Sequence, residues 1–336
     1  FVFSYGGTSL FGLLYFFELP NDGFNFETQS AQMGIRRFQS LYFLSHGMLS
    51  ILFIYFNLDG LTRFRTIWMW PVSVGLLAIG ALSGHRYLLI VLAIQMPIYA
   101  WSQRFVTFRR FVSAAPGALI LLILTYTFAR SLPDAAQRTV SLLPGIEVSR
   151  VARMDGEVTW EGRRELRRLG WELAPNYYLL GRGFAKNDLP ASANPAVAQL
   201  NPDTFYNGFI GLLVSTGVPG TTGMMILLVA GNLLAIRILR TLRRMEINDN
   251  FLRLTALQAG FFVAQTIIFL GFHGDAEFAL RAFGLPVATL MVCERHLRIR
   301  LASSETAPVR WQEQPFRRRD GAGVGLPPAA AGASAS

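Results

Sequence analysis

Two neighbouring stretches, TWEGRRELRRLGWELAPNYYLLGRGF at 159–184 and NPDTFYNGFIGLLVSTGVPG at 201–220, decide how this chain is organised. Together they form the only long polar region that lies between apolar segments. They are dense in arginine and aromatic residues, and they end where a strongly apolar helix is predicted to begin. If the chain carries out a reaction, we expect the site in this region.

The composition points to a membrane. Hydrophobic residues make up 52% of the chain and charged residues 15%, which is too apolar for a soluble domain and typical of a polytopic membrane protein. Phe1 is not a methionine and lies in an apolar run, so the helix count is a lower bound. Cys293 is the single cysteine, which excludes an internal disulfide. The net charge of +10 indicates cytoplasmic loops and anionic lipid or pyrophosphate partners, because no nucleic-acid-binding motif accompanies it.

Apolar runs long enough to cross about 30 Å of hydrocarbon predict an all-α protein with about eight transmembrane helices. The runs are 1–17, 38–58, 66–82, 87–103, 113–129, 219–236, 251–272 and 277–293. Arginines gather on alternate connections, which predicts that those connections are cytoplasmic and that the long loop 130–206 is external. The helical membrane domain then covers 1–301. The Gly/Ala/Pro-rich segment 302–336 is predicted to be a disordered cytoplasmic tail.

The apolar residues at 206–236 are too many for one straight span, and Gly217 to Gly220 interrupt them. We expect 206–216 to form a short helix that lies at the external interface or re-enters the membrane. Residues 219–236 are then long enough to cross alone at about 1.5 Å per residue. A break at this depth must be buried in protein or line a cavity.

Several arginines of the external loop share a predicted helix, on which residues three and four apart lie on one face. They are Arg163, Arg164, Arg167 and Arg168. Two arginines on one face, flanked by Trp160 and Trp171, form a fork-like site for a phosphate or diphosphate near the membrane surface. The alternative is an interfacial amphipathic helix whose arginines contact lipid head groups.

Three other short features carry open alternatives. Arg86, at the external end of a span, either binds an anion in a cavity or anchors the span by reaching to the interface. Gly181-Arg182-Gly183 lacks the third glycine of a dinucleotide fingerprint and predicts a tight turn. Tyr206-Asn207 either orients a sugar hydroxyl or forms a helix cap beside an interfacial aromatic residue.

The order of these motifs resembles the O-antigen ligase and polysaccharide polymerase family over roughly 82–290. An arginine near the external end of a mid-chain span, Arg86, precedes a long loop with arginine and then tryptophan at 167–171. A Gly-x-Gly-Phe turn follows at 181–184. A Tyr-Asn pair at 206–207 then opens an apolar helix that contains Gly217 and Gly220.

The resemblance implies an all-helical glycosyltransferase of the cell inner membrane. It would transfer a glycan from undecaprenyl diphosphate to an acceptor sugar or lipid, without a nucleotide, metal or other cofactor. On this resemblance Arg86 and Arg168, or the neighbouring Arg167 and Arg164, bind the diphosphate and stabilise the charge that grows on it. Asn207 and Trp171 are then expected to contact the sugar.

One position departs from the family, which has histidine where this chain has Tyr206. Histidine titrates near pH 6.5 and accepts a proton readily, whereas a phenol titrates near pH 10 and is a poor base. Losing a general base costs about a hundredfold to ten-thousandfold in rate. Either arginines lower the pKa of the phenol, or Asp203, His273 or His85 serves as the base, or the diphosphate leaves with little help.

The same departure motivates a second class, a non-catalytic relative that binds lipid-linked glycan or scaffolds a polysaccharide export assembly. A transporter is a third class, and the near absence of charged residues midway along the spans disfavours it. His46 lies within a span between Ser45 and Gly47, residues that suit close helix packing. We expect it to be a packing histidine with a satisfied hydrogen bond.

Overall fold

The computed structural model describes residues 39–60, 68–83, 86–105, 117, 119–120, 122–141, 143–184, 205–245, 249–272, 274 and 276–306. Within these ranges the chain forms helices joined by turns, without a strand, which confirms the all-α class. The predicted span at 1–17 and tail residues 307–336 lie outside the described residues.

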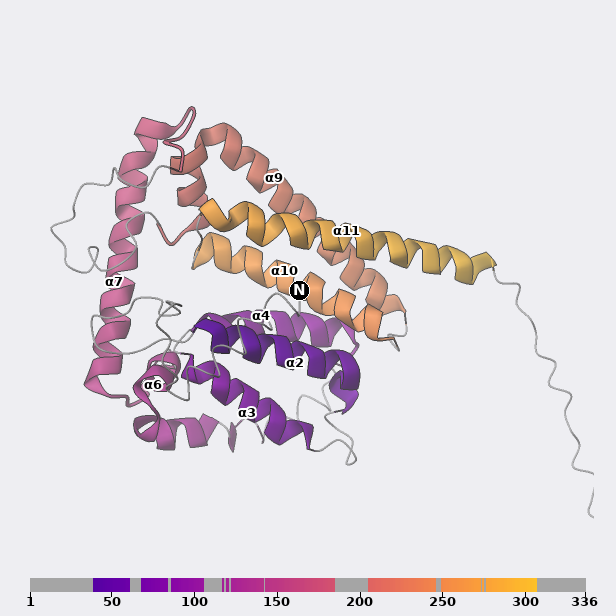
Figure 1. Ribbon diagram of the computed structural model, residues 1–336, viewed down its shortest axis with the longest axis horizontal. Coiled ribbons are helices and arrows are strands. Elements are labelled where there is room, and N and C mark those ends of the chain that lie inside the picture. Colours follow the sequence, from indigo (N-terminus) through magenta and orange to yellow (C-terminus); the bar gives the residue numbers. More distant parts are fainter. Residues whose placement is uncertain are drawn as a thin grey trace, which may run out of the picture. The chain divides into compact units, whose positions relative to one another are not determined.

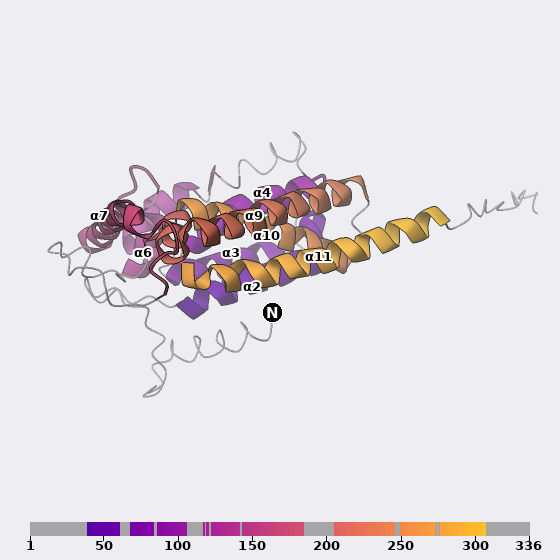
Figure 2. The same ribbon diagram turned by 90° about the horizontal axis from the view of Figure 1, so that it is seen from above.

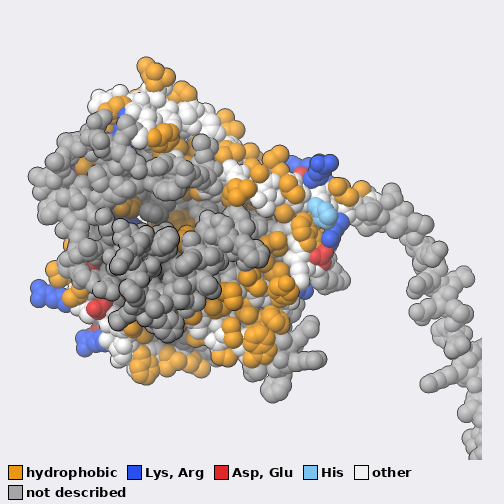
Figure 3. All heavy atoms as spheres, viewed as in Figure 1, with side chains coloured by type: hydrophobic (Ala, Val, Ile, Leu, Met, Phe, Trp, Pro, Cys, Tyr) orange, Lys and Arg blue, Asp and Glu red, His pale blue; other side chains and the backbone are white. Residues whose placement is uncertain are grey.

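Among the described residues, three helices are long and apolar enough to cross a membrane: 41–58 within α2 (Gln39–Gly60), α9 (Gly208–Arg244) and α10 (Asn250–Gly271). Two shorter apolar helices are α3 (Met69–Leu82) and α4 (Tyr87–Ser102), and α11 runs over Ala276–Thr306. On the face shown in Figure 3, hydrophobic side chains cover much of the described surface. By helix length and composition this is a membrane protein.

The apolar helices pack through α10, which contacts α9, α4 and α2, while α2 packs on α3 (Figure 1). Inside this bundle the Gln95 amide of α4 donates to the Leu257 carbonyl of α10 at 3.1 Å, and its oxygen lies 2.8 Å from Nε2 of His46 on α2. Hydrogen bonds between helices satisfy polar groups in an apolar interior. His46 is therefore a packing histidine, as the sequence predicts.

The long loop contains the short helices η2 (Ala129–Ser131), α6 (Asp134–Val140) and η3 (Ala174–Tyr177), and the long helix α7 (Arg150–Leu173). Ser149 caps α7, accepting a hydrogen bond from the Ala152 backbone N–H at 3.2 Å. α7 lies across the ends of the bundle helices: it runs perpendicular to them in Figure 1 and is seen nearly end-on in Figure 2. It contacts α6, η3 and α9.

α9 is two helices joined at a break. Gly217 has φ 65° and ψ −172°, outside the helical region, and Pro219 follows it. Asn207 caps the first half, which bends away from the second in Figure 1. The predicted interruption after residue 216 is thus confirmed.

The Gly181-Arg182-Gly183 segment is the predicted tight turn, since both glycines have positive φ, 72° and 78°. It lies against the break in α9. The Arg182 and Gly183 backbone N–H groups donate to the carbonyls of Val214 and Ser215 at 2.8 and 2.9 Å. The second half of α9 is tied to the same segment, because the Val218 N–H donates to the Tyr178 carbonyl at 2.7 Å. The turn thus satisfies backbone groups that the break leaves without helical partners.

Basic residues also meet at the end of the bundle opposite α7. Arg104, which follows α4, donates to the carbonyls of Arg243 and Arg244 at 2.6 and 3.2 Å. Arg253 of α10 donates to the Ile54 carbonyl of α2 at 2.9 Å. These guanidiniums donate to backbone carbonyls near helix C-termini, where the carbonyls carry partial negative charge.

Candidate functional site

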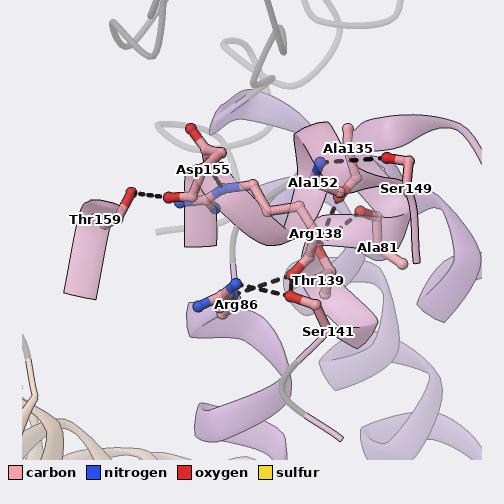
Figure 4. A network of polar contacts seen from close by, with 10 residues as sticks. All are labelled: Ala81, Arg86, Ala135, Arg138, Thr139, Ser141, Ser149, Ala152, Asp155 and Thr159. Atoms are coloured by element: carbon pink, nitrogen blue, oxygen red, sulfur yellow. Dashed lines mark hydrogen bonds and ion pairs between the residues drawn. The ribbon is translucent and has the colours of Figure 1, made fainter. Parts of the chain in front are cut away.

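Arg86 is the residue that begins α4, and it is held by the end of α6 (Figure 4). Its Nε donates to the Arg138 backbone carbonyl at 3.0 Å, and its Nη2 donates to Ser141 Oγ at 2.8 Å. Ser141 Oγ itself donates to the Arg138 carbonyl at 2.7 Å. The guanidinium therefore faces the long loop instead of reaching along the span toward head groups.

Arg138 also forms an ion pair through its side chain. Its Nε donates to Oδ2 of Asp155 on α7, and the two side chains are only 5% and 6% exposed. Thr159 Oγ1 donates to the Asp155 backbone carbonyl one turn away at 2.6 Å. A buried ion pair fixes the spacing of the two helices, because separating its partners leaves an uncompensated buried charge. α6 and α7 are thereby locked together around Arg86.

Gly156 lets Arg86 lie directly on α7. A Cβ placed at this glycine would be 2.6 Å from Arg86 Nη2, closer than real Cβ contacts allow. Any larger residue would displace the guanidinium or push α7 away. The glycine therefore sets where the Arg86 charge lies on the loop helix.

Arg163 follows two turns later on α7, where its guanidinium carbon lies 4.8 Å from the ring centroid of Tyr206. Tyr206 adopts φ 48°, a left-handed conformation that is rare for a tyrosine. Arg163 Nε is buried and has no hydrogen-bond partner among the described residues. Buried donors are normally satisfied, so this N–H, which has no acceptor among the described residues, is a candidate donor to a bound ligand.

The cluster brings together three guanidiniums, those of Arg86, Arg138 and Arg163, and Arg138 is paired with the Asp155 carboxylate. Burial lowers the pKa of Arg86 to about 10; the charges of Arg138 and Arg163 add to this, and Asp155 opposes it. Burial also lowers the pKa of Arg163, with Tyr206 opposing the shift. Both guanidiniums remain charged at neutral pH. An anion bound here would relieve the repulsion between them.

Arg168 and Arg164 lie on the other side of α7. Arg168 is 64% exposed and pairs with carboxylates of its own helix, Glu165 at 2.7 Å and Glu172 at 3.7 Å. Arg164 is exposed as well. In the structure Arg86 lies on the same side of α7 as Arg163. Arg168 and Arg164, which the resemblance assigns to the diphosphate, lie on the other side.

The remaining predicted residues have varied surroundings. The Arg167 guanidinium lies 5.3 Å from the Trp160 ring centroid, and Trp171 is 51% exposed. Asn207 Oδ1 accepts from the Ile210 N–H at 3.1 Å, and its amide nitrogen donates to the Leu270 carbonyl at 2.8 Å, so both ends act as cap and helix link. Asp203, His273 and His85 lie outside the described residues.

An apolar groove lies along α9. It has a volume of about 480 Å³ and runs along both halves of α9, from Phe209 to Leu233. Val218, at the break, lies on its wall, and the lining is almost entirely hydrophobic. Apolar grooves of this size bind ligands with large hydrophobic parts.

Sequence reasoning missed Arg138, Asp155 and Gly156 as parts of the site. The available signal was the spacing of small residues on α7 at 152, 156, 159, 162 and 170, which all prove buried together with Leu166. That stripe marks the inward face, and Arg163 lies seven residues after Gly156 on the same face. Charged residues beside such a stripe are the ones that contact the rest of the protein.

The described residues contain no group of three or more His, Cys, Asp or Glu side chains able to hold a metal ion, and the expectation of a metal-independent reaction stays a prediction. Comparison with known proteins gives no family: no protein-family model, curated protein or solved structure matches the chain significantly.

Proposed function

We propose that this protein is a glycosyltransferase of the O-antigen ligase and polysaccharide polymerase kind. It transfers a glycan from undecaprenyl diphosphate to an acceptor sugar or lipid at the external face of the cell inner membrane. The observation that carries the proposal is that Arg86, from a distant segment, packs on Gly156 of α7, seven residues before Arg163 on the same helix. The charge of Arg163 contributes to lowering the pKa of Arg86. Arg163 adds a buried N–H without a partner among the described residues.

The proposal places the α7 end of the bundle outside the cell. Arg104, Arg243 and Arg253 lie at the opposite end, and arginine and lysine concentrate on the cytoplasmic side of membrane proteins. The long loop 130–206 is then external, and about eight spans complete the topology. This orientation puts the arginine cluster on the same side of the membrane as a lipid-linked donor in the outer leaflet.

In the proposed reaction Arg86 and Arg163 bind the diphosphate of the donor. The acceptor hydroxyl oxygen attacks the anomeric carbon, the bond from that carbon to the diphosphate oxygen breaks, and its electron pair leaves with the diphosphate. Guanidiniums in a partly dehydrated site stabilise this growing negative charge without reorganising. The proton of the acceptor passes to a base, for which Tyr206, Asp203 and His273 are the candidates.

The apolar groove on α9 supports a lipid-linked donor. It begins at Phe209, three residues after Tyr206, and its wall is hydrophobic. The isoprene units nearest the diphosphate would lie in the groove, and the rest of the tail would extend into the bilayer. A soluble nucleotide-sugar donor would have no use for such a surface.

The test compares two arginines of one helix. Arg163→Ala is expected to reduce glycan transfer about a hundredfold to a thousandfold, the usual loss when a donor that stabilises developing charge is removed. Arg168→Ala removes the same charge from the exposed side of α7 and should leave transfer near wild type. The readout is product formed by purified protein in liposomes that contain lipid-diphosphate-linked oligosaccharide and acceptor. Equal losses in the two variants would reject this site.

One observation favours the non-catalytic alternative, namely that the Tyr206 ring already packs on Arg163. In that case the chain binds lipid-linked glycan without transferring it. Tyr206→His separates the two functions, because a histidine there supplies the base that the family has. A large gain in transfer indicates a weakened enzyme, whereas retained donor binding with no transfer by either form indicates a binding protein.

A further inference from the structure

The segment that follows η3 presents two leucines to the exterior. Leu179 and Leu180 are 82% and 85% exposed, far more than the other large hydrophobic residues of the described chain. Exposed aromatic residues stand near them in sequence on both sides, Trp171, Tyr178 and Phe184. Water-facing leucines at a turn are costly, so such a cluster usually has an apolar partner.

Backbone hydrogen bonds and close packing fix the position of this segment along the axis of α9. The Val218 N–H donates to the Tyr178 carbonyl, and Gly181 packs so closely on Ser215 that a Cβ there would overlap its carbonyl. At Gly217 a Cβ would lie 2.7 Å from the Leu179 carbonyl oxygen. Leu179 and Leu180 are therefore level with the start of the second half of α9.

The second half of α9 is long enough to cross the hydrocarbon layer. From Val218 to Arg237, the first charged residue of the second half, α9 rises about 28 Å at 1.5 Å per residue. The hydrocarbon core of a bilayer is about 30 Å thick. Between these residues α9 exposes Ile226, Val229 and Leu233, as a lipid-facing helix does.

We propose that Leu179 and Leu180 insert into the bilayer at the edge of the hydrocarbon core and anchor the end of α7 to the membrane. The occupant of this surface is the acyl chains of membrane lipid, because the surface is continuous with the lipid-facing side of α9 at Val218. The aromatic residues around the pair lie at head-group level, where tryptophan and tyrosine concentrate. Because the same turn satisfies the break in α9, the anchor also holds that break at the membrane surface.

The experiment uses nitroxide spin labels on the full chain in liposomes. Cys293 is the single cysteine and is buried, so Cys293→Ser gives a background for labelling at Leu180→Cys. Ile267→Cys on α10, exposed and outside the α9 groove, is the lipid-facing reference, and Glu161→Cys, on the exposed side of α7, is the aqueous reference. Collision with oxygen, which partitions into lipid, is compared with collision with a water-soluble nickel complex.

The label at Leu180 is expected to resemble the label at Ile267, with several-fold more collision with oxygen than with nickel. A pattern like that of Glu161 would overturn the anchor and leave the pair in water. Protection from both reagents, or spectral broadening by a label on a second copy, would also overturn it in favour of a protein contact. None of these outcomes depends on glycan transfer.

Discussion

The two sides of α7 carry arginines in different environments, one buried and one exposed. On the inward side Arg163 lies against Tyr206 with a buried N–H, seven residues from the glycine that supports Arg86. On the outward side Arg168 is exposed and shares its charge with two glutamates of its own helix. The difference shows that one helix can hold arginines in two environments. One donor is buried without a partner among the described residues, and the other charge is neutralised by neighbouring carboxylates.

The inward side depends most on the buried ion pair between α6 and α7. Asp155→Ala leaves the Arg138 guanidinium buried without its carboxylate, which we expect to lower the free energy of unfolding by about 3–5 kcal/mol. The matched outward change, Glu165→Ala, removes a surface partner of Arg168 and should cost about 0–1 kcal/mol. Thermal unfolding of the purified proteins in one detergent measures both.

A rescue variant separates packing from charge in that experiment. Replacing both partners, Arg138→Met with Asp155→Leu, removes the charges together and should recover most of the lost stability. If Asp155→Ala and Glu165→Ala have equal effects, the two sides of α7 do not differ as the geometry indicates.

The sequence predicted much of the fold and part of the site. Apolar runs and the Gly217 interruption predicted the helices around α9 because hydrophobic length and backbone freedom are local properties. It also predicted Arg86, the loop helix and the turn at 181–183. It named the four loop arginines but favoured the side that carries Arg168, because motif order does not specify which face of a helix is buried.

The remaining site residues depend on tertiary contacts. Arg138 and Asp155 are 17 residues apart, on two helices whose packing no local pattern specifies. For Asn207 the sequence left a sugar contact and a helix cap open, and the structure shows the cap, with the side chain bonded to the backbone of α9 and α10. Only the small-residue stripe of α7 offered a sequence signal for the inward face.

Gly156 provides a smaller test of the inward side. Gly156→Ala places a methyl group against Arg86 Nη2, and overpacking of this kind costs about 1–3 kcal/mol. We expect weaker binding of a dialkyl diphosphate, measured by calorimetry in detergent. Gly75→Ala on α3 adds a methyl group with nothing within 4 Å and should leave binding unchanged. Unchanged affinity in Gly156→Ala would mean that Arg86 does not contact the diphosphate.

The pH dependence of that binding tests the charge of Arg86. Its pKa is lowered to about 10, so the proton is held less tightly in the fold than in the unfolded chain, and deprotonation favours the fold above that pH. Affinity for a diphosphate diester, which keeps its charge, should stay constant from pH 7 to about 9 and fall about tenfold as the pH passes 10. In Arg86→Gln the affinity is lower from the start and this step should be absent. A wild-type curve that stays flat to pH 11 would contradict it.

The outward side should give the smallest effect. Arg168→Gln removes a guanidinium that is 64% exposed, and exposed ion pairs contribute about 0–1 kcal/mol, less at high salt. The free energy of unfolding should therefore change by less than about 1 kcal/mol, and any difference from wild type should shrink between 0.1 and 1 M salt. A larger, salt-independent loss would place Arg168 in a dehydrated contact. α7 would then carry dehydrated arginines on both sides. Burial would no longer distinguish Arg163 from Arg168 as the arginine proposed to bind the diphosphate.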